Sequence, residues 1–487
     1  MATYSNLSVS VFIFAAFLYV AHVLRRPTSK VPGPWYSKWT GIVLQYHWLR
    51  GQRTYYIHSL HQRYGPTVRL SPNEIGLASI HDVKTVYHLR ETYVKSSFYT
   101  DVTVSSQPNM FNTPNVQYNR RLRRLLGGPM SDSAIRGVEP IVVELATLAI
   151  QRMGEEISRR GAVDVLKWWT SMATDVIGTL TFGESFRTLE QGKPSAYTRD
   201  LAQVGPVAGL RATFPSLIPL TDYIPIPFLK AARDATHRIM QYSRESIQRY
   251  QNLLDSDSSR AQHTFFSNVF KAADDDKLTS DEVCAAALTY IVAGTDTTAN
   301  SLTYLTWSVC RNPKMKARLL DELQSLPQDY SDSHLRKLPF LNHLIDETLR
   351  LYSAAPASLP RVVPSNGAEL GTYWVPGGTV VSAQPYTMHR DPIVFPRPEE
   401  FNPERWETVT PDMKSHFMPF GRAGRICIGM HLAYMELRHG AAKFFLEFPN
   451  ATISSKEGMS DEEMTPEIFF LLGPKGHRCL IESEGRL

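Results

Sequence analysis

A single cysteine in a glycine-rich loop is the strongest chemical feature of the sequence. The loop Phe420–Gly429 reads Phe-Gly-Arg-Ala-Gly-Arg-Ile-Cys-Ile-Gly, and a predicted helix over 430–448 follows it. A helix N-terminus lowers the pKa of a nearby thiol, so the pattern predicts a thiolate at Cys427. Such a thiolate is a typical ligand for a soft or redox-active metal, for example iron. The other three cysteines read as small buried apolar residues, and without a CxxC pair they do not indicate a zinc ribbon or a thioredoxin-like site.

A second feature interrupts a long helix predicted over 281–312. Within it, Ala293–Thr298 reads Ala-Gly-Thr-Asp-Thr-Thr, a run of poor helix formers with one acid. Such breaks of local preference occur most often at functional or strained sites. Gly294 would let a ligand approach the backbone, Thr297 can hydrogen-bond a carbonyl one turn back, and Asp296 adds an acid beside that hydroxyl. The alternative interpretation is a Gly/Thr kink with a solvated aspartate.

An acidic and a basic residue three positions apart form a third feature, within a helix predicted over 340–351. Glu347 and Arg350 share one helix face, so their side chains can pair. Such pairs are common on solvated surfaces, where each contributes little stability. On its own this pair therefore indicates little, and only its place among the other features gives it weight.

These three features, in the chain order 293–298, 347–350 and 420–429, resemble the cytochrome P-450 superfamily of haem-thiolate monooxygenases. The family pattern around the cysteine is F-x-x-G-x-R-x-C-x-G, and Phe420, Arg425, Cys427 and Gly429 match it. The fourth position departs from the pattern, because it holds Ala423 with a glycine after it. The departure concerns the geometry of the turn more than the identity of the ligand.

Further stretches carry the same resemblance. Ala293–Thr298 is similar to the family's helix motif A/G-G-x-D/E-T-T, and Glu347 with Arg350 to its E-x-x-R. The segment 401–406 reads Phe-Asn-Pro-Glu-Arg-Trp and resembles the one whose arginine joins that pair. Arg405 is therefore expected to complete a structural Glu-Arg-Arg network.

The resemblance implies haem b, an iron protoporphyrin IX, with Cys427 as the ligand of the metal. Asp296 and Thr297 would be catalytic and would organise a proton path to O2. Electrons are expected from NADPH through a partner NADPH-cytochrome reductase. Asn119 stands where family members often carry Trp or His for a propionate contact. The expected cofactor-binding residues are Arg123, Ala293, Gly294, Arg361, Phe420, Arg425, Cys427 and Gly429.

The resemblance also implies a substrate region rich in aromatic residues, which favours a small apolar or aromatic substrate. The sequence looks most like fungal microsomal members, which are often found in secondary metabolism. Two alternatives stay open: oxidative coupling, dehydration or rearrangement without oxygen insertion, and a non-enzymatic haem-binding sensor. The expected substrate contacts are residues 98–114, Tyr290, Ala293, residues 354–359, Phe469 and Phe470.

The N-terminal end predicts a membrane anchor. Residues 7–24 contain no charged side chain, and Arg25 and Arg26 follow at once. At about 1.5 Å per residue, such a helix nearly crosses a bilayer core. The basic flank on its C-terminal side predicts a single-pass anchor in the endoplasmic reticulum membrane with a cytosolic catalytic domain. The run Val-Pro-Gly-Pro-Trp then predicts a stiff hinge.

The remaining sequence predicts one large catalytic domain. The chain has 487 residues and a net charge of +5, too diffuse for a nucleic-acid partner. We expect a mainly α fold with small β-sheets (α+β): a hairpin over 67–77, helices over 140–156 and 234–254, and a proline-rich coil with short strands beyond 351. The predicted domains are the anchor (1–26), the hinge (27–35) and the haem-binding catalytic domain (36–487).

Overall fold

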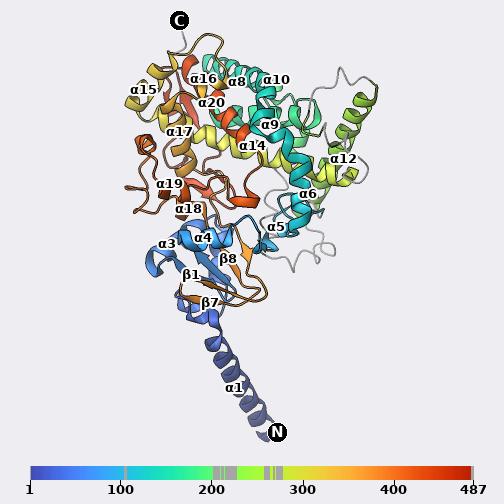
Figure 1. The fold of residues 1–487 in the computed structure, drawn as a ribbon, viewed down its shortest axis with the longest axis vertical. Coiled ribbons are helices and arrows are strands. Elements are labelled where there is room, and N and C mark those ends of the chain that lie inside the picture. Colours follow the sequence, from blue (N-terminus) through green and yellow to red (C-terminus); the bar gives the residue numbers. More distant parts are fainter. Residues whose placement is uncertain are drawn as a thin grey trace.

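Helices dominate the computed structural model, which describes residues 2–103, 107–200, 209, 213, 227–256, 264–266, 269 and 278–483, without the side chains of residues 2–13, 228, 229 and 253–256. The sheets that contain β1, β8 and β7 lie toward the end of the molecule from which the N-terminal helix projects, and the long helices pack in the other part (Figure 1). The predicted fold class, mainly α with small β-sheets, is confirmed.

The central element is α14 (Ser280–Cys310), which runs through the helical part of the molecule (Figure 1). It begins with a capping box, in which the Thr279 hydroxyl and the Glu282 carboxylate each accept a backbone N–H of the other residue. It packs against α9 (Val165–Phe182) and α20 (Met430–Glu447), and the shared core is almost entirely apolar. The helix predicted over 281–312 is confirmed with nearly the same ends.

The other predicted helices are also present. Proline at the first or second helical position starts several of them, because it sets the backbone angle and needs no hydrogen bond there. The structure extends the helix predicted over 140–156 by one residue at its start and four at its end. The longer helices are α6 (Val116–Gly127), α8 (Glu139–Arg160), α12 (Pro227–Ser256), α15 (Pro313–Leu323) and α17 (Pro339–Leu351).

The largest sheet has the strand order β1-β2-β8-β5-β3. β1 and β2 form the predicted antiparallel hairpin, with Val68 opposite Gly76, so that prediction is confirmed. β2 pairs with β8 in parallel, which joins the N-terminal part of the chain to the segment beyond residue 351. The strands are β1 (Thr67–Ser71), β2 (Glu74–Leu77), β3 (Val94–Lys95), β5 (Arg361–Val362) and β8 (Val380–Ser382).

Short elements connect these parts, and the proline-rich stretch beyond residue 351 is the predicted coil with short strands. The remaining strands are β4 (Val163–Asp164), β6 (Ala368–Leu370), β7 (Tyr373–Val375), β9 (Thr452–Ile453), β10 (Pro466–Ile468), β11 (Leu472–Pro474) and β12 (Leu480–Glu482). Short helices include α2 (Ile42–Leu49), α3 (Arg53–Tyr64), α4 (Ile80–Val86), α5 (Phe98–Asp101), α7 (Asp132–Ile135), α10 (Thr188–Gln191), α16 (Asp332–Leu335), α18 (Pro385–Met388) and α19 (Pro411–His416).

The N-terminal helix α1 (Ala2–Arg25) projects from the sheet end of the molecule (Figure 1). Among the residues whose side chains the structure describes, no helix is long and apolar enough to cross a membrane. The first half of the predicted anchor lies outside those residues, so the anchor stays a prediction. Behind α1, the buried guanidinium of Arg69 donates to the carbonyls of Val31 and Pro34, which ties the proline-rich segment to the sheet.

Candidate active site

The cysteine loop ends at the start of α20. The Cys427 N–H donates to the Phe420 carbonyl at 2.8 Å and closes the loop, and Gly429 is the residue before the helix. Cys427 is exposed, yet surrounding protein desolvates its thiol. A side chain with both properties faces an open space inside the molecule. Burial raises the thiol pKa, and the Gly429 N–H and Arg123 oppose this less strongly, so the pKa prediction from the sequence is wrong in direction for the free thiol.

The departure from the family's loop pattern has a structural consequence. Ala423 adopts a φ of 52°, in the left-handed region where a Cβ is unfavourable and glycine is the usual residue. The glycine at 424 serves another purpose, because a Cβ there would lie 2.7 Å from the Glu91 Oε1. The turn of the family pattern is therefore kept at position 423 with some backbone strain.

Four cations gather next to the loop, and they outnumber their acidic partners. The Arg425 Nε donates to Glu91, and its Nη1 donates to the Thr113 carbonyl at 3.0 Å. The pKa of the buried Lys95 lies well below its usual range, because burial and the charges of Arg361, Arg425 and Arg123 disfavour its charged form, while Glu91 opposes them. Glu91 is the one carboxylate that the described part of the chain pairs with this cation cluster (Lys95, Arg123, Arg361 and Arg425).

Two of these cations also hold the surrounding backbone. The Arg123 Nη1 donates to the Ile426 carbonyl at 2.8 Å, directly before the cysteine. The Arg361 Nη1 donates to the Tyr99 hydroxyl at 2.9 Å. Sequence reasoning named both arginines but missed Lys95 of β3 and the loop residue Glu91, because nothing in a single sequence shows that such a lysine or glutamate will be buried.

The position where relatives often carry Trp or His is occupied by a buried amide. Asn119 lies on α6, fully buried, and its Nδ2 donates to the Met110 carbonyl at 3.0 Å. The amide therefore ties α6 to the backbone at Met110. Its Oδ1 has no hydrogen-bond partner in the described structure.

The middle of α14 opens toward the interior. Ala293 and Asp296 are exposed although the helix is buried on both sides of them, and burial by surrounding protein still raises the pKa of Asp296. Thr297 donates to the Ala293 carbonyl at 2.5 Å, as the sequence predicts. Cys427 combines exposure and desolvation in the same way, and we call the accessible surfaces of Ala293, Asp296 and Cys427 together the interior opening.

Gly294 has a different neighbour from the one expected. A Cβ at this position would lie 2.8 Å from the Ile177 Cγ1 on α9. The glycine therefore permits the close packing of α14 on α9, and the approach of a ligand to its backbone stays a prediction. Helix packing produces the same demand for glycine as a bound ligand does, so the sequence alone cannot separate them.

A buried glutamate on α20 lies beside the α14 motif. The Thr298 hydroxyl donates to the Glu436 Oε2 at 3.3 Å. Burial raises the pKa of Glu436 to about 8, so this side chain is largely protonated at neutral pH. Sequence reasoning missed Glu436, although a lone acid in the apolar first turns of α20 was a usable signal.

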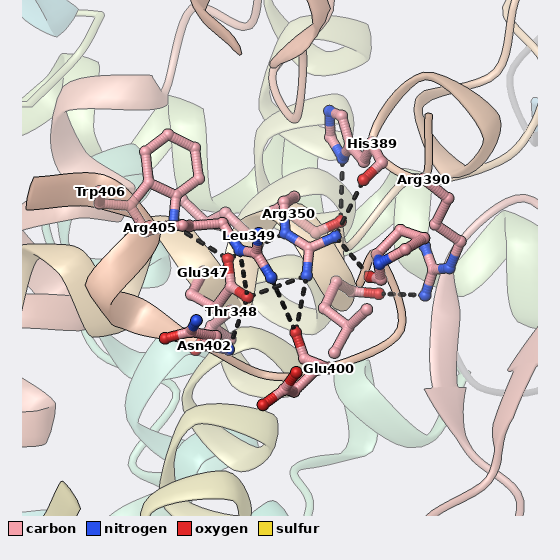
Figure 2. Close-up of polar contacts among 12 residues, drawn as sticks. Glu347, Thr348, Leu349, Arg350, His389, Arg390, Glu400, Asn402, Arg405 and Trp406 are labelled. Atoms are coloured by element: carbon pink, nitrogen blue, oxygen red, sulfur yellow. Dashed lines mark hydrogen bonds and ion pairs between the residues drawn. The ribbon is translucent and has the colours of Figure 1, made fainter. Parts of the chain in front are cut away.

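The Glu347 and Arg350 pair lies at the centre of a closed network (Figure 2). Both side chains are completely buried, and two hydrogen bonds of 2.8 and 2.9 Å join them. The Arg405 Nε donates to the Glu347 Oε1 at 3.1 Å, and the Trp406 Nε1 donates to the Oε2 at 2.9 Å. Glu347, Arg350 and Arg405 thus form one network.

A buried histidine links this network to the cysteine loop. The His389 Nδ1 donates to the Arg350 carbonyl at 2.9 Å, and its Nε2 accepts the Met418 N–H at 2.8 Å. Burial lowers the pKa of His389 to about 3, so the ring is neutral and keeps one donor and one acceptor. Met418 lies two residues before Phe420, so the network supports the segment that carries the cysteine.

Aromatic rings from distant segments meet in the region assigned to the substrate. Phe98 lies 5.9 Å from Phe470 between ring centroids, and Phe111 lies 5.7 Å from Phe470. Phe469 is exposed instead. Tyr290 packs on Phe265 and Phe266 within the core. The structure thus brings together only some of the aromatic residues that the sequence assigned to the substrate.

The residues present fit a haem. The interior opening gives it space beside Cys427, and the excess of cations matches the carboxylates of its propionates. The hydroxyl of Tyr290, one turn before Ala293 on α14, is buried and has no hydrogen-bond partner in the described structure. The charges of Arg123 and Cys427 act on this hydroxyl, which places it near the cysteine.

Comparison with known proteins agrees with this geometry. The model of the family described as Cytochrome P450 matches residues 31–480, so the chain belongs to the cytochrome P450 family. The cytochrome P450 monooxygenase tazI of Aspergillus terreus is 43% identical, with 95% of each chain covered. The cytochrome P450 monooxygenase orf2 of Aspergillus niger is 38% identical, again with 95% of each chain covered.

A third relative is also a fungal cytochrome P450 monooxygenase. The cytochrome P450 monooxygenase azaI of Aspergillus niger is 37% identical over 86% of this chain and 94% of its own. These fungal relatives and the family match define the protein as an oxidoreductase of the monooxygenase type. The prediction of the family and of this enzyme class is confirmed.

Proposed function

We propose that the protein is a haem-thiolate monooxygenase that uses O2 and electrons from NADPH, passed on by a partner reductase, to oxidise a small apolar or aromatic molecule in fungal secondary metabolism. The observation that carries the proposal is the interior opening, where Cys427 on the loop and Asp296 on α14 are both accessible inside the protein. The aromatic contacts of Phe98 and Phe111 with Phe470 support the substrate class.

The site residues divide into those that bind the haem and those that transfer protons. Cys427 holds the iron, and Arg123, Arg361 and Arg425 hold the propionates together with Lys95. A bound haem with a thiolate ligand supplies the oxidising power for O–O bond cleavage. A coordinated thiol is deprotonated, which overcomes the raised pKa of the free thiol.

Asp296 and Thr297 hold and pass protons. The raised pKa of Asp296 moves its carboxyl toward the range in which it both accepts and donates a proton near neutral pH. The Thr297 hydroxyl donates its hydrogen bond to the Ala293 carbonyl, so the lone pairs of its oxygen remain available to accept another hydrogen bond.

The test of this proposal removes the hydroxyl. Thr297→Ala is expected to uncouple NADPH consumption from product formation by a factor on the order of 100, the lower end of the usual contribution of a positioned proton-handling group, and to release peroxide. Ser301→Ala on the same helix is the control, because the Ser301 hydroxyl only donates to the Thr297 carbonyl at 2.8 Å. Unchanged coupling in Thr297→Ala would contradict the proton role.

The proposed setting is the cytosolic face of the endoplasmic reticulum membrane. Residues 7–24 are the proposed single-pass anchor, and the basic residues behind them favour a cytosolic catalytic domain. The exposed Arg120 and Arg124 lie on α6 opposite the buried Leu122 and Leu126, and they give the proposed reductase a basic surface. Separation of membrane and soluble fractions, with and without residues 1–26, tests the anchor.

Product mass distinguishes the reaction types. Incubation of the haem-loaded protein with reductase, NADPH and candidate aromatic metabolites is expected to add one oxygen atom to the substrate. A product with loss of hydrogen or water, or a dimer, would instead show coupling or dehydration. Absence of any NADPH-dependent product with every candidate tested would contradict the proposed oxidation of an aromatic substrate.

A further inference from the structure

Glu91 is a buried carboxylate with an unusual backbone. It lies in the loop between α4 and β3, and only 8% of its surface is exposed. Its φ of 54° falls in the left-handed region, which residues other than glycine seldom adopt. Strain of this kind persists only where the surrounding structure holds it, and it clusters at functional sites. The chain therefore accepts a strained loop residue in order to bury this carboxylate.

The cysteine loop leaves room for the Glu91 side chain. A Cβ at Gly424 would lie 2.7 Å from the Glu91 Oε1 and 2.9 Å from the Glu91 Cδ. Glycine at position 424, next to the strained Ala423, is the feature in which this loop departs from the family pattern. The departure therefore has a structural counterpart outside the loop, because Gly424 gives the carboxylate the space that a side chain would fill.

Arg425 is the partner of this carboxylate. The Arg425 Nε donates to Glu91, and each of the two side chains is only 7% exposed. The Arg425 Nη1 donates to the Thr113 carbonyl at 3.0 Å, so the protein fixes the guanidinium at two points. The Arg120 Nε also approaches the Glu91 Oε1, at 4.0 Å, but this arginine is 48% exposed and solvent weakens its charge. Glu91 therefore sets the direction in which the Arg425 guanidinium points.

The charges of the cation cluster balance only when Glu91 is included. Lys95 of β3 lies directly opposite Arg361 of β5, and two positive charges in such a cross-strand pair repel each other. The lowered pKa of Lys95 relieves this repulsion, because the neutral amine still donates to the Phe111 carbonyl. With Lys95 neutral, the positive charges of the three arginines meet one negative charge on Glu91 and one on each propionate of a haem. The buried site is then neutral, as buried sets of charges tend to be.

We propose that Glu91 is a positioning residue for the cofactor: its carboxylate orients the Arg425 guanidinium and cancels one charge of the cation cluster, so that the propionates of a haem complete a neutral site. The same charge helps to set the reduction potential of the bound iron. Nearby positive charge favours the reduced iron and nearby negative charge opposes it. The proposal rests on the proposed function for the identity of the cofactor, but the ion pair itself is testable without it.

The first experiment measures the ion pair by urea unfolding of the full chain. Glu91→Gln keeps the size of the side chain and leaves Arg425 buried without its counter-charge, so the unfolding constant is expected to rise by at least about 100-fold. Glu91→Gln together with Arg425→Gln removes both charges and is expected to recover most of that change. If the effects of the two single substitutions simply add, Glu91 does not position Arg425 and the proposal is overturned.

The second experiment measures the reduction potential, which a purely structural role would not change. In the haem-loaded chain, Glu91→Gln is expected to shift the equilibrium toward ferrous iron by on the order of tenfold, a rise of about 59 mV for one electron. Glu91→Asp keeps the charge and should keep the potential close to that of the parent. The same potential in Glu91→Gln as in the parent would overturn the charge role.

The matched control is another buried carboxylate. Glu156 on α8 is 7% exposed and pairs with Arg160 at 2.9 Å and Lys167 at 3.1 Å, outside the cation cluster. Glu156→Gln breaks these pairs and should leave the potential unchanged. An equal rise in the potential of this variant would overturn the proposal, because general loosening of the fold would then be the cause.

The two experiments separate this proposal from the proposed function. A parent chain that forms no thiolate-type spectrum would contradict the proposed function. The urea experiment needs no spectrum, so coupling between Glu91 and Arg425 in that chain would still support the positioning role, and additive effects would still overturn it.

Discussion

Two clusters of buried charge hold the cysteine loop, and they differ in how completely their hydrogen bonds are made. In the Glu347 network, all five N–H groups of Arg350 donate, to Glu347 and to three backbone carbonyls. In the cation cluster, Lys95 and three arginines have Glu91 as the one carboxylate that the described residues pair with them. The first cluster is closed and structural, whereas the second is open to an anionic ligand.

The difference shows how buried charges that stabilise the fold can be told apart from buried charges that bind a ligand. A buried ion pair with every hydrogen bond satisfied stabilises one conformation and leaves nothing for a ligand. A buried group with excess charge or a missing partner is stable only when something else binds there. Four changes, from the largest expected effect to the smallest, test this contrast.

Replacement of the cysteine has the largest effect. Cys427→Ala is expected to abolish the thiolate-type carbon monoxide difference spectrum of the reduced protein completely, since no other cysteine lies in the loop. Cys284→Ala, at a buried cysteine on α14, is the control and should keep that spectrum. A normal spectrum in Cys427→Ala would falsify the assignment of the iron ligand.

Breaking the closed network costs stability. Glu347→Gln leaves the buried Arg350 without its counter-charge and is expected to lower the free energy of unfolding by about 3–5 kcal/mol. Urea unfolding measures the change. Glu400→Gln, which breaks the exposed pair between Arg397 and Glu400, should change it by less than about 0.5 kcal/mol. Similar small losses in both variants would show that the network is not closed in solution.

The buried carboxyl of Glu436 makes stability depend on pH. Its folded pKa of about 8 lies above the ordinary 4.5, so the folded state keeps a proton that the unfolded state releases. Its contribution is full below pH 4.5 and is lost as the pH rises through 8. Glu436→Gln removes this loss, and at pH 8 it is expected to be more stable than the parent by a few kcal/mol.

The control for this pH effect lies on the same helix. Glu447→Gln changes an exposed carboxylate at the end of α20 and should leave the pH profile of the parent almost unchanged. Unfolding measured from pH 5 to 8 separates the variants. If Glu436→Gln shows the same pH slope as the parent, the carboxyl ionises in the folded protein with an ordinary pKa.

The strained loop residue gives the smallest effect. Ala423→Gly removes the Cβ from a backbone with a φ of 52° and is expected to stabilise the folded protein by up to about 1 kcal/mol. Gly424→Ala is the matched opposite, because its Cβ would meet Glu91, and it should destabilise the protein. Thermal unfolding of both variants measures these opposite changes in stability. Destabilisation by Ala423→Gly would contradict the backbone strain at position 423.

Much of the architecture follows from local patterns. The hairpin β1–β2 and the long helix α14 were predictable because alternation, helical spacing and proline positions act over a few residues. Cys427 was found because its glycine-rich loop and following helix are contiguous. The packing of Gly294 against Ile177 was not predictable, because glycine suits a ligand or a neighbouring helix equally well and Ile177 is more than a hundred positions away.

Residues that act through distant partners were the ones missed. Glu91 meets Arg425 across 334 positions of sequence, and His389 joins Arg350 to Met418 across two separate loops. The sequence around Glu91 and around His389 gives no sign that these side chains will be buried. The direction of the Cys427 pKa was also missed, because desolvation depends on all the surrounding protein.

The sequence by itself determined the helical framework, the hairpin, the cysteine loop and the family to which the chain belongs, because these depend on short contiguous patterns. Only the tertiary structure decided that every hydrogen-bond donor of Arg350 has a partner and that Lys95 and Glu91 lie beside the cysteine loop. Burial, pairing and enclosed space arise from contacts between distant segments, and those contacts exist only after the chain has folded.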